Sequence, residues 1–260
     1  MNYSTLIYEE KDSIATIRLN RPESLNAVDT TMIREFIDVC DRIEGNDEIR
    51  AVVLLGNGKA FSAGGDIKEF ETIKGSAGFL NHMILGSTCV TKLYQLTRPV
   101  VTGIHGYTMG AGLNLALACD IIIAADNLKL SEIFGKIGFI PDAGGTYILP
   151  RLVGRAKAKE LVFTYKTIDA QEALSIGLVT RVVAVEELEK AVYELAGELA
   201  KNATVSINLA KQLINRSYET DLQSMLDYER LAQTIAANTE DFKEGTAAFV
   251  EKRNAQFKGR

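Results

Sequence analysis

The chain has 260 residues, of which 47% are hydrophobic and 24% are charged, and it carries a formal net charge of -5 at pH 7. This length and hydrophobic content allow a substantial core and lie at the upper end of the usual size of one domain. The negative charge argues against nucleic acid or an anionic membrane as the main partner. With two histidines and three cysteines, the chain has too few ligands for a usual zinc site.

The first residues show no basic segment followed by an apolar core, and no window reaches the roughly 18 apolar residues of a membrane span. We therefore expect a cytoplasmic protein without a membrane partner. Cys40, Cys89 and Cys119 are odd in number and far apart in apolar surroundings, which favours reduced core thiols over disulfides.

The N-terminal region predicts a strand hairpin followed by a helix. Apolar residues alternate in 4–8 and again in 14–19, with charged residues between these two segments. After a loop, Asp29 is placed to cap a helix that runs to about Glu44, where a glycine follows.

The middle of the chain alternates between predicted strands and helices. Strands are expected at 51–55, 100–104 and 120–124, and helices at about 78–97 and 110–118. This alternation predicts right-handed crossovers and a largely parallel inner sheet, and so an α/β fold.

The C-terminal part is predicted to be mainly helical. From about Ala143 onward the pattern is helical except for a strand within 178–183. We expect an α/β core over residues 1–184 and a helical region over 185–260, which docks on the core or on a neighbouring subunit.

Two glycine-rich turns follow predicted strands, at 61–69 and 106–114. In open α/β sheets ligands bind beyond the carboxyl ends of strands, near helix N-termini. Neither turn has the lysine and hydroxyl of a P-loop or the spacing of a dinucleotide fingerprint. Two interpretations stay open for each turn: glycine serves only backbone geometry, or backbone N-H groups hold a negative oxygen.

Several motifs occur in order over nearly the whole chain, and together the sequence resembles the crotonase family, the enoyl-CoA hydratase/isomerase superfamily. The resemblance implies a repeated ββα spiral followed by helices that build homotrimers, often paired as homohexamers. The motifs that carry it are Asn20–Pro22, Leu25–Ala27, Phe61–Lys68, Pro99–Gly106, Gly110–Gly112, Ala118–Ile122 and Ile140–Thr146.

The resemblance also implies roles for individual residues. The backbone N-H groups of Gly65 and Ala111 would form an oxyanion hole for a thioester carbonyl, and alanine would serve if its φ is negative. Lys252 would reach a coenzyme A phosphate, sometimes across a subunit boundary, or would be a solvated helix charge. The remaining positions implied to contact coenzyme A through the main chain are Leu25, Ala27, Ala63, Asp66 and Ile67.

The chain departs from the family at both glutamates that its hydratases use, which are replaced by Asn114 and Phe134. Asn114 lies three residues after Ala111, so its amide is expected to point into the same crevice, although it cannot act as an acid or base. The alternatives are a local hydrogen bond for Asn114 and a plain core role for Phe134, which would otherwise form an apolar wall of the substrate pocket.

Asp142 is then the remaining candidate acid or base, since other family members place a catalytic aspartate in the corresponding loop. The alternative is an N-cap for the helix that follows. Apolar neighbours would raise its pKa and helix N-H donors would lower it, so the direction of the shift stays open.

These residues predict an acyl-CoA isomerase in which one aspartate moves a proton and the oxyanion hole holds a thioester enolate. The segments around Asn114 and Asp142 resemble the epoxyphenylacetyl-CoA isomerase branch, which acts in phenylacetate catabolism and also shifts double bonds. The alternatives are an enoyl-CoA hydratase and a coenzyme A ester-binding protein without catalysis. No metal or further cofactor is expected, because coenzyme A is part of the substrate and the thioester itself acidifies the α-proton.

Overall fold

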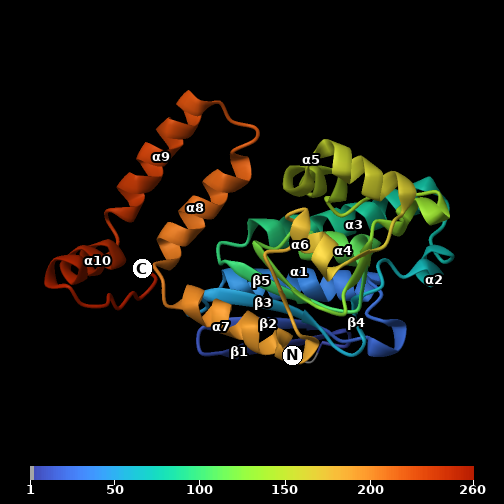
Figure 1. Cartoon of the computed structure of the whole chain (residues 1–260), viewed down its shortest axis with the longest axis horizontal. Helices are drawn as coiled ribbons and strands as arrows, with labels where there is room; N and C mark the ends of the chain where they lie inside the picture. Colours follow the sequence, from blue (N-terminus) through green and yellow to red (C-terminus); the bar gives the residue numbers. More distant parts are fainter. Residues whose placement is uncertain (1–2) are drawn as a thin grey trace.

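The computed structural model describes residues 3–260, and its chain begins with an antiparallel hairpin (Figure 1). Strands β1 (Leu6–Lys11) and β2 (Ile14–Leu19) pair in register from Leu6 opposite Leu19. The predicted hairpin is confirmed, but the charged residues before Asp12 belong to β1. They are tolerated there because β1 is an edge strand, and only Asp12 and Ser13, both with positive φ, form the turn.

The hairpin opens a six-stranded sheet in the order β1-β2-β3-β5-β7-β10. The inner strands β3 (Ala51–Gly56), β5 (Val100–Ile104) and β7 (Ile121–Ala125) run parallel to one another, as does β10 (Arg181–Val183) to β7. Every residue of β3 and β5 is buried, as expected for strands covered on both faces. The predicted parallel inner sheet is therefore confirmed.

A second, four-stranded sheet was not predicted from the sequence. It has the order β4-β6-β8-β9 and consists of two- and three-residue strands, too short to show a hydrophobic period. This sheet carries the glycine-rich turns, because β4 leads into the glycines of one turn and β6 into those of the other. Its strands are β4 (Ala60–Ser62), β6 (Tyr107–Met109), β8 (Lys129–Ser131) and β9 (Ile168–Asp169).

Helix α1 (Thr30–Glu44) begins as predicted, with the Asp29 carboxylate accepting a hydrogen bond from the Met32 N-H at 2.7 Å. We expect Asp29→Ala to lower the free energy of unfolding by about 1 kcal/mol, because a helix N-H loses its acceptor. Urea denaturation measures the loss. Arg34→Ala, an exposed change on the same helix, is the control, and equal losses in both variants would contradict a capping role.

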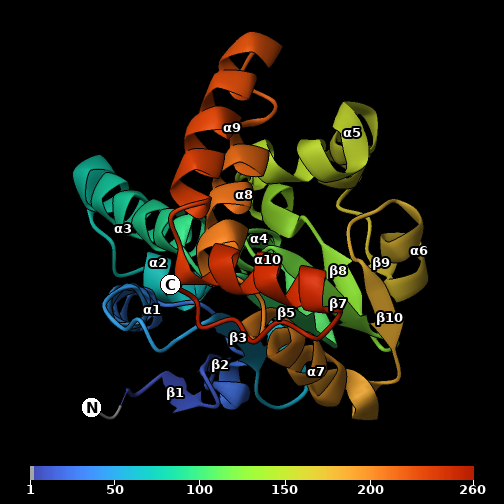
Figure 2. The ribbon, with the colours of Figure 1, turned by 90° about the vertical axis from the view of Figure 1, so that its left-hand side faces the viewer.

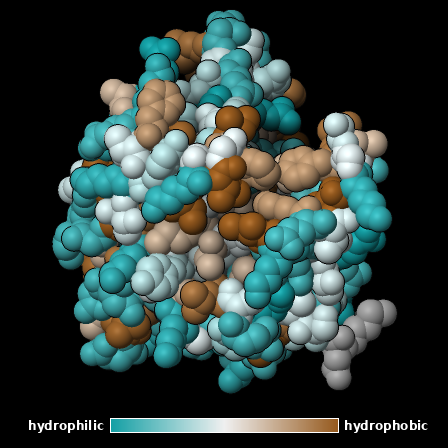
Figure 3. Space-filling model, turned by 90° about the vertical axis from the view of Figure 1, so that its right-hand side faces the viewer, coloured by the Kyte–Doolittle hydropathy of each residue, from teal (hydrophilic) through white to brown (hydrophobic). Residues whose placement is uncertain are grey.

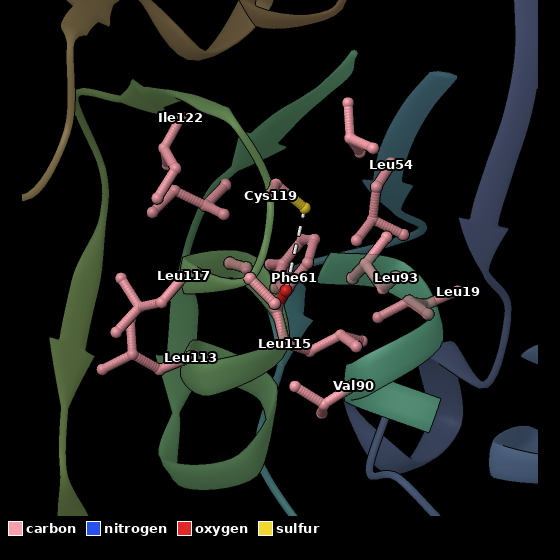
Figure 4. Close-up of a cluster of buried hydrophobic side chains, with 14 of the residues drawn as sticks. Leu19, Leu54, Phe61, Val90, Leu93, Leu113, Leu115, Leu117, Cys119 and Ile122 are labelled. Atoms are coloured by element: carbon pink, nitrogen blue, oxygen red, sulfur yellow. Dashed lines mark hydrogen bonds between the residues drawn. The ribbon is translucent and has the colours of Figure 1, made fainter. Parts of the chain in front are cut away.

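Further helices cover the sheet and meet in one hydrophobic core (Figure 4). Two helices follow β4, α2 (Ile67–Phe70) and α3 (Gly75–Gln95), and α4 (Gly110–Leu117) follows β6. The buried side chains of α3 and α4 pack in one cluster with those of β3. In this core the Cys119 thiol donates to the Leu115 carbonyl at 3.7 Å. All three cysteines are free and buried, as predicted.

The C-terminal helices divide into a packed part and an extended part that reaches away from the body in Figure 1 and faces the viewer in Figure 2. Helix α7 (Leu188–Ala200) packs against the sheet, where Leu188 and Val192 join a second core cluster. Lys211 of α8 forms a salt bridge with Asp120 of the core, with 2.7 Å between Nζ and Oδ2.

The remaining helices are α5 (Gly145–Thr164), α6 (Ala170–Ser175), α7 (Leu188–Ala200), α8 (Thr204–Arg216), α9 (Leu222–Ala236) and α10 (Glu240–Glu251), with short 3-10 turns at Pro22–Ser24, Ile133–Ile137 and Val185–Glu187. Across residues 3–260, no helix combines the length and hydrophobicity that a membrane span requires.

Candidate active site

A cavity of about 360 Å³ lies where the two glycine-rich turns meet the loop before α5. Three of the predicted site residues line it together: Gly65, Ala111 and Asp142. The walls are otherwise mostly apolar and come from α1, α3 and α4, including Met32, Phe36, Leu80, Ile84, Val90 and Leu115. An apolar cavity with few polar groups is the usual form of a small-molecule site.

Gly65 and Ala111, whose backbone N-H groups are the predicted donors, both line this cavity. Within residues 3–260, neither donates a hydrogen bond to another protein group. Ala111 lies in the first turn of α4 and has a negative φ, so alanine fits this position without strain. The turns touch at Gly64, where an added Cβ would lie 3.0 Å from the Met109 oxygen and 3.7 Å from the Ala111 nitrogen. Gly64 therefore brings the first turn into contact with the start of α4, beside the Ala111 nitrogen.

Asp142 is the carboxylate that lines the cavity, and it does not cap α5. The N-cap of α5 is Gly144, which has no capping side chain, while the Asp142 main-chain carbonyl accepts from the Gly145 N-H at 2.8 Å. Burial raises the pKa of Asp142 from 3.8 to about 6, opposed by its own backbone N-H. The sequence left the direction of the Asp142 pKa shift open, and in the structure this pKa is raised. The ionised carboxylate is therefore a stronger base than that of an ordinary aspartate.

Asn114 supports the Asp142 loop and does not line the cavity. Its side chain is fully buried, and its Nδ2 donates to the Asp142 carbonyl at 2.9 Å. The amide lies against Gly145, where an added Cβ would come within 2.3 Å of Nδ2, so only glycine leaves room for it. This contact spans 28 residues and replaces the local hydrogen bond considered as an alternative.

Phe134 is a core residue behind the cavity. It is buried, and its ring lies 3.6 Å from the position of a Cβ on Gly110, at the start of α4. Phe134 is not among the residues that line the cavity, so the predicted apolar wall at this position is not observed. Its ring instead contacts the start of α4, the helix that carries Ala111.

The positions implied to cradle coenzyme A gather around one side of the cavity. The Ala63 N-H donates to the Leu25 carbonyl, and the Asp66 N-H to the Val28 carbonyl, both at 2.9 Å. Arg21 holds these segments together, because its guanidinium donates to the Ala27 carbonyl at 2.6 Å and pairs with Asp66 at 3.0 Å. Sequence reasoning missed Arg21, whose proximity to Asp66 depends on the fold.

Ile67 and Lys252 occupy exposed positions. Ile67 opens α2 and is 54% exposed. Lys252 follows the last residue of α10, which lies on the opposite side of the molecule from α2 (Figure 1), so a single chain does not bring Lys252 to the cavity.

An aromatic cluster borders the cavity beside α2 and α3. The sequence alone did not reveal this cluster. Phe70 packs against Phe79, His82 and Phe139 with ring centroids 5.5 to 5.8 Å apart, and Phe70 and His82 line the cavity. Figure 3 shows hydrophobic side chains gathered around a hollow on the face at this end of the molecule.

A second carboxylate, Glu132, lies behind Asp142 and was also missed. It directly follows β8 and is 1% exposed. Burial raises the pKa of Glu132 to about 8, the neighbouring Asn114 amide lowers it, and the charge of Asp142 raises it further. Its sequence signal was weak because a glutamate at a strand end is usually a surface residue.

The sequence matches the enoyl-CoA hydratase/isomerase family over residues 9–260. It is 39% identical to the short-chain-enoyl-CoA hydratase of Clostridium acetobutylicum, with 100% of both chains covered. It is 37% identical to the 1,2-epoxyphenylacetyl-CoA isomerase of Escherichia coli over 95% of each chain. The crystal structure of enoyl-CoA hydratase from Bacillus anthracis superposes with a TM-score of 0.94 at 34% identity, covering 99% of this chain and 100% of that one.

The relatives' names include both hydration and isomerisation, and the similarity to them extends over nearly the full length of the chain. The predicted crotonase-like α/β fold is confirmed by the structural match. The chain therefore belongs to the enoyl-CoA hydratase/isomerase family.

Proposed function

We propose that this protein is an acyl-CoA isomerase that shifts a double bond or opens an epoxide ring of the epoxyphenylacetyl-CoA type. One observation carries the proposal: Asp142 is the ionisable carboxylate in a cavity that also presents the free N-H groups of Gly65 and Ala111. The positions of the two glutamates used by the family's hydratases hold Asn114 and Phe134, which cannot exchange protons.

In the double-bond shift, the Asp142 carboxylate removes a proton from a carbon of the acyl group. The electron pair of that C-H bond forms an enolate, whose oxygen accepts hydrogen bonds from Gly65 and Ala111. Protonated Asp142 then returns the proton to a different carbon of the same system, so the carboxylate is regenerated and no co-reactant is consumed. The enolate needs no cofactor besides the coenzyme A that the substrate carries.

Substrate binding in this proposal uses both the cavity and the segments beside it. The apolar walls favour an apolar acyl group, and the main chain of Leu25, Ala63 and Asp66 would hold coenzyme A. Lys252 would reach a coenzyme A phosphate of a neighbouring subunit in a homotrimer or homohexamer.

The raised pKa of Asp142 predicts an acid limb in the pH profile. Because the reaction starts from the ionised carboxylate, kcat/KM should rise about tenfold per pH unit below about pH 6 and level off above it. An ordinary aspartate would instead level off near pH 4. Initial rates between pH 4.5 and 7 with a 3-enoyl-CoA measure the limb, and a profile flat down to pH 5 would contradict this role of Asp142.

Hydration of a 2-enoyl-CoA is the alternative, supported by the hydratase names of relatives such as that of Clostridium acetobutylicum. It would require Asp142 to activate a water instead of a C-H bond. Two rates on one enzyme preparation separate the reactions: conversion of 3-enoyl-CoA to 2-enoyl-CoA, followed as gain of conjugated enoyl absorbance, and loss of that absorbance from crotonyl-CoA.

The isomerase proposal predicts that the first rate exceeds the second by at least about tenfold. A faster second rate would establish the hydratase instead. Saturable binding of acyl-CoA esters with neither rate above background would support the non-catalytic alternative.

A further inference from the structure

Where Asp142 borders the cavity and in the core next to it, four buried oxygen atoms have no hydrogen-bond donor among residues 3–260. They are both carboxylate oxygens of Glu132, Asn114 Oδ1 and Asp142 Oδ1. Glu132 and Asn114 are 1% and 0% exposed, so the bulk solvent does not reach these two side chains. Unpaired buried polar groups are costly, and four acceptors around one site need an explanation.

The deficit is one of donors, and a proton on Glu132 supplies one. An ionised carboxylate and an amide oxygen only accept hydrogen bonds, and the Asn114 Nδ2, which donates one N-H to the Asp142 carbonyl, has a single N-H left for these four oxygens. A protonated carboxyl of Glu132 gains an O-H donor, and burial favours this neutral form because desolvation raises its pKa.

Among residues 3–260, no cation is among the groups that act on the Glu132 carboxyl. Helix α4, which carries Asn114, contains no ionisable side chain, and the charged group that acts on Glu132 is Asp142, which disfavours a second negative charge. On the neighbouring strands and turn, Lys129 and Asp169 face each other in the β8–β9 register and are exposed, as is Lys136.

Two tyrosines also lie on segments next to Glu132. Tyr107 on β6 is exposed under Lys129, and Tyr165 packs over Gly135. A tyrosine side chain is never a cation, so neither one can favour the ionised form of Glu132 by its charge.

We infer that Glu132 is held protonated and donates a hydrogen bond to Asn114 Oδ1, which makes it a positioning residue for the Asp142 loop. The bond fixes one end of the amide, and the other end, Nδ2, holds the Asp142 carbonyl at 2.9 Å. The catalytic consequence rests on the proposed role of Asp142, whereas the protonation of Glu132 does not.

This arrangement predicts what happens when Glu132 ionises. The donor is lost and a second negative charge appears beside Asp142, so the loop loosens and kcat falls as the pH rises through about 8. Glutamine in place of Glu132 keeps a neutral donor of the same shape at every pH. Methionine keeps the length and removes the donor.

The experiment compares Glu132→Gln and Glu132→Met with the unchanged enzyme. We expect Glu132→Gln to keep kcat within about threefold at pH 7 and to lose the decline above pH 8. Glu132→Met should lower kcat at least about tenfold with little change in KM, the effect of one lost hydrogen bond at a positioned group. Equal loss in both variants would overturn the inference, because it would mean that Glu132 itself transfers protons. Unchanged kcat in Glu132→Met, or a decline above pH 8 that persists in Glu132→Gln, would also overturn it.

Infrared spectroscopy tests the protonation without any substrate. The unchanged protein at pH 6 to 7 should show the C=O stretching band of a protonated carboxylic acid that is absent from Glu132→Gln and retained in Glu48→Gln, a surface control. If the enzyme proves not to be an isomerase, this band still decides the state of Glu132. Its absence would overturn the inference even in an active isomerase.

Discussion

Asp142→Asn is expected to lower kcat for double-bond migration by about 10²–10⁴-fold, the range typical for loss of a positioned general base. The asparagine side chain has the same size but cannot accept and return a proton at neutral pH. The Asp142 main-chain carbonyl is unchanged, so its bond from Asn114 at 2.9 Å should persist and the loop should keep its shape. Affinity for a saturated acyl-CoA, measured by calorimetry, should therefore change less than about threefold.

The matched control is Asp47→Asn, which makes the same chemical change at a fully exposed side chain. It should leave both kcat and affinity unaltered. If Asp142→Asn turns over substrate at the rate of this control, the proton-transfer role of Asp142 is wrong. If it loses affinity and kcat in parallel, the residue contributes to binding and not specifically to the chemical step.

Gly64→Ala is expected to lower kcat/KM by about 10²–10³-fold, comparable to removal of an oxyanion donor. Gly64 has a φ of 101°, a region that residues with a Cβ rarely adopt. The added methyl group would also lie 3.0 Å from the Met109 oxygen, so the two turns must separate. That movement changes the spacing of the Gly65 and Ala111 N-H groups, which no side-chain substitution can delete directly.

Stability and activity should both be measured for this variant, because backbone strain also costs roughly 1–3 kcal/mol of folding free energy. Gly197→Ala is the control: it lies inside α7 with nothing within 4 Å of the added Cβ, and it should leave kcat/KM unchanged. Full activity in a folded Gly64→Ala protein would show that the turn contact does not set the oxyanion geometry.

The fold was predictable where the sequence has a clear period or cap. The alternation in β1 and β2, the Asp29 cap of α1 and the apolar run of β3 each gave an element close to its observed bounds. The second sheet escaped prediction because its strands, such as β9 at Ile168–Asp169, are too short for a period to appear. Their formation depends on pairing between distant segments.

The active site was predictable in part for the same reason. Gly65 and Ala111 lie in glycine-rich turns whose residues show directly in the sequence, and both residues line the cavity. The contact between Asn114 and the Asp142 carbonyl joins residues 28 apart, and no local pattern specifies it. Glu132 was missed because its burial follows from the packing of α4 against β8, whereas its residue type suggests the surface.

Proton movement in deuterated water tests the central claim most directly. A 3-enoyl-CoA is incubated with the enzyme and, in parallel, with Asp142→Asn, and NMR follows double-bond position, deuterium uptake and hydration. The account predicts bond migration to the 2-enoyl-CoA without 3-hydroxyacyl-CoA, and its loss in the variant. Rapid formation of 3-hydroxyacyl-CoA, or migration at an unchanged rate in Asp142→Asn, would contradict it.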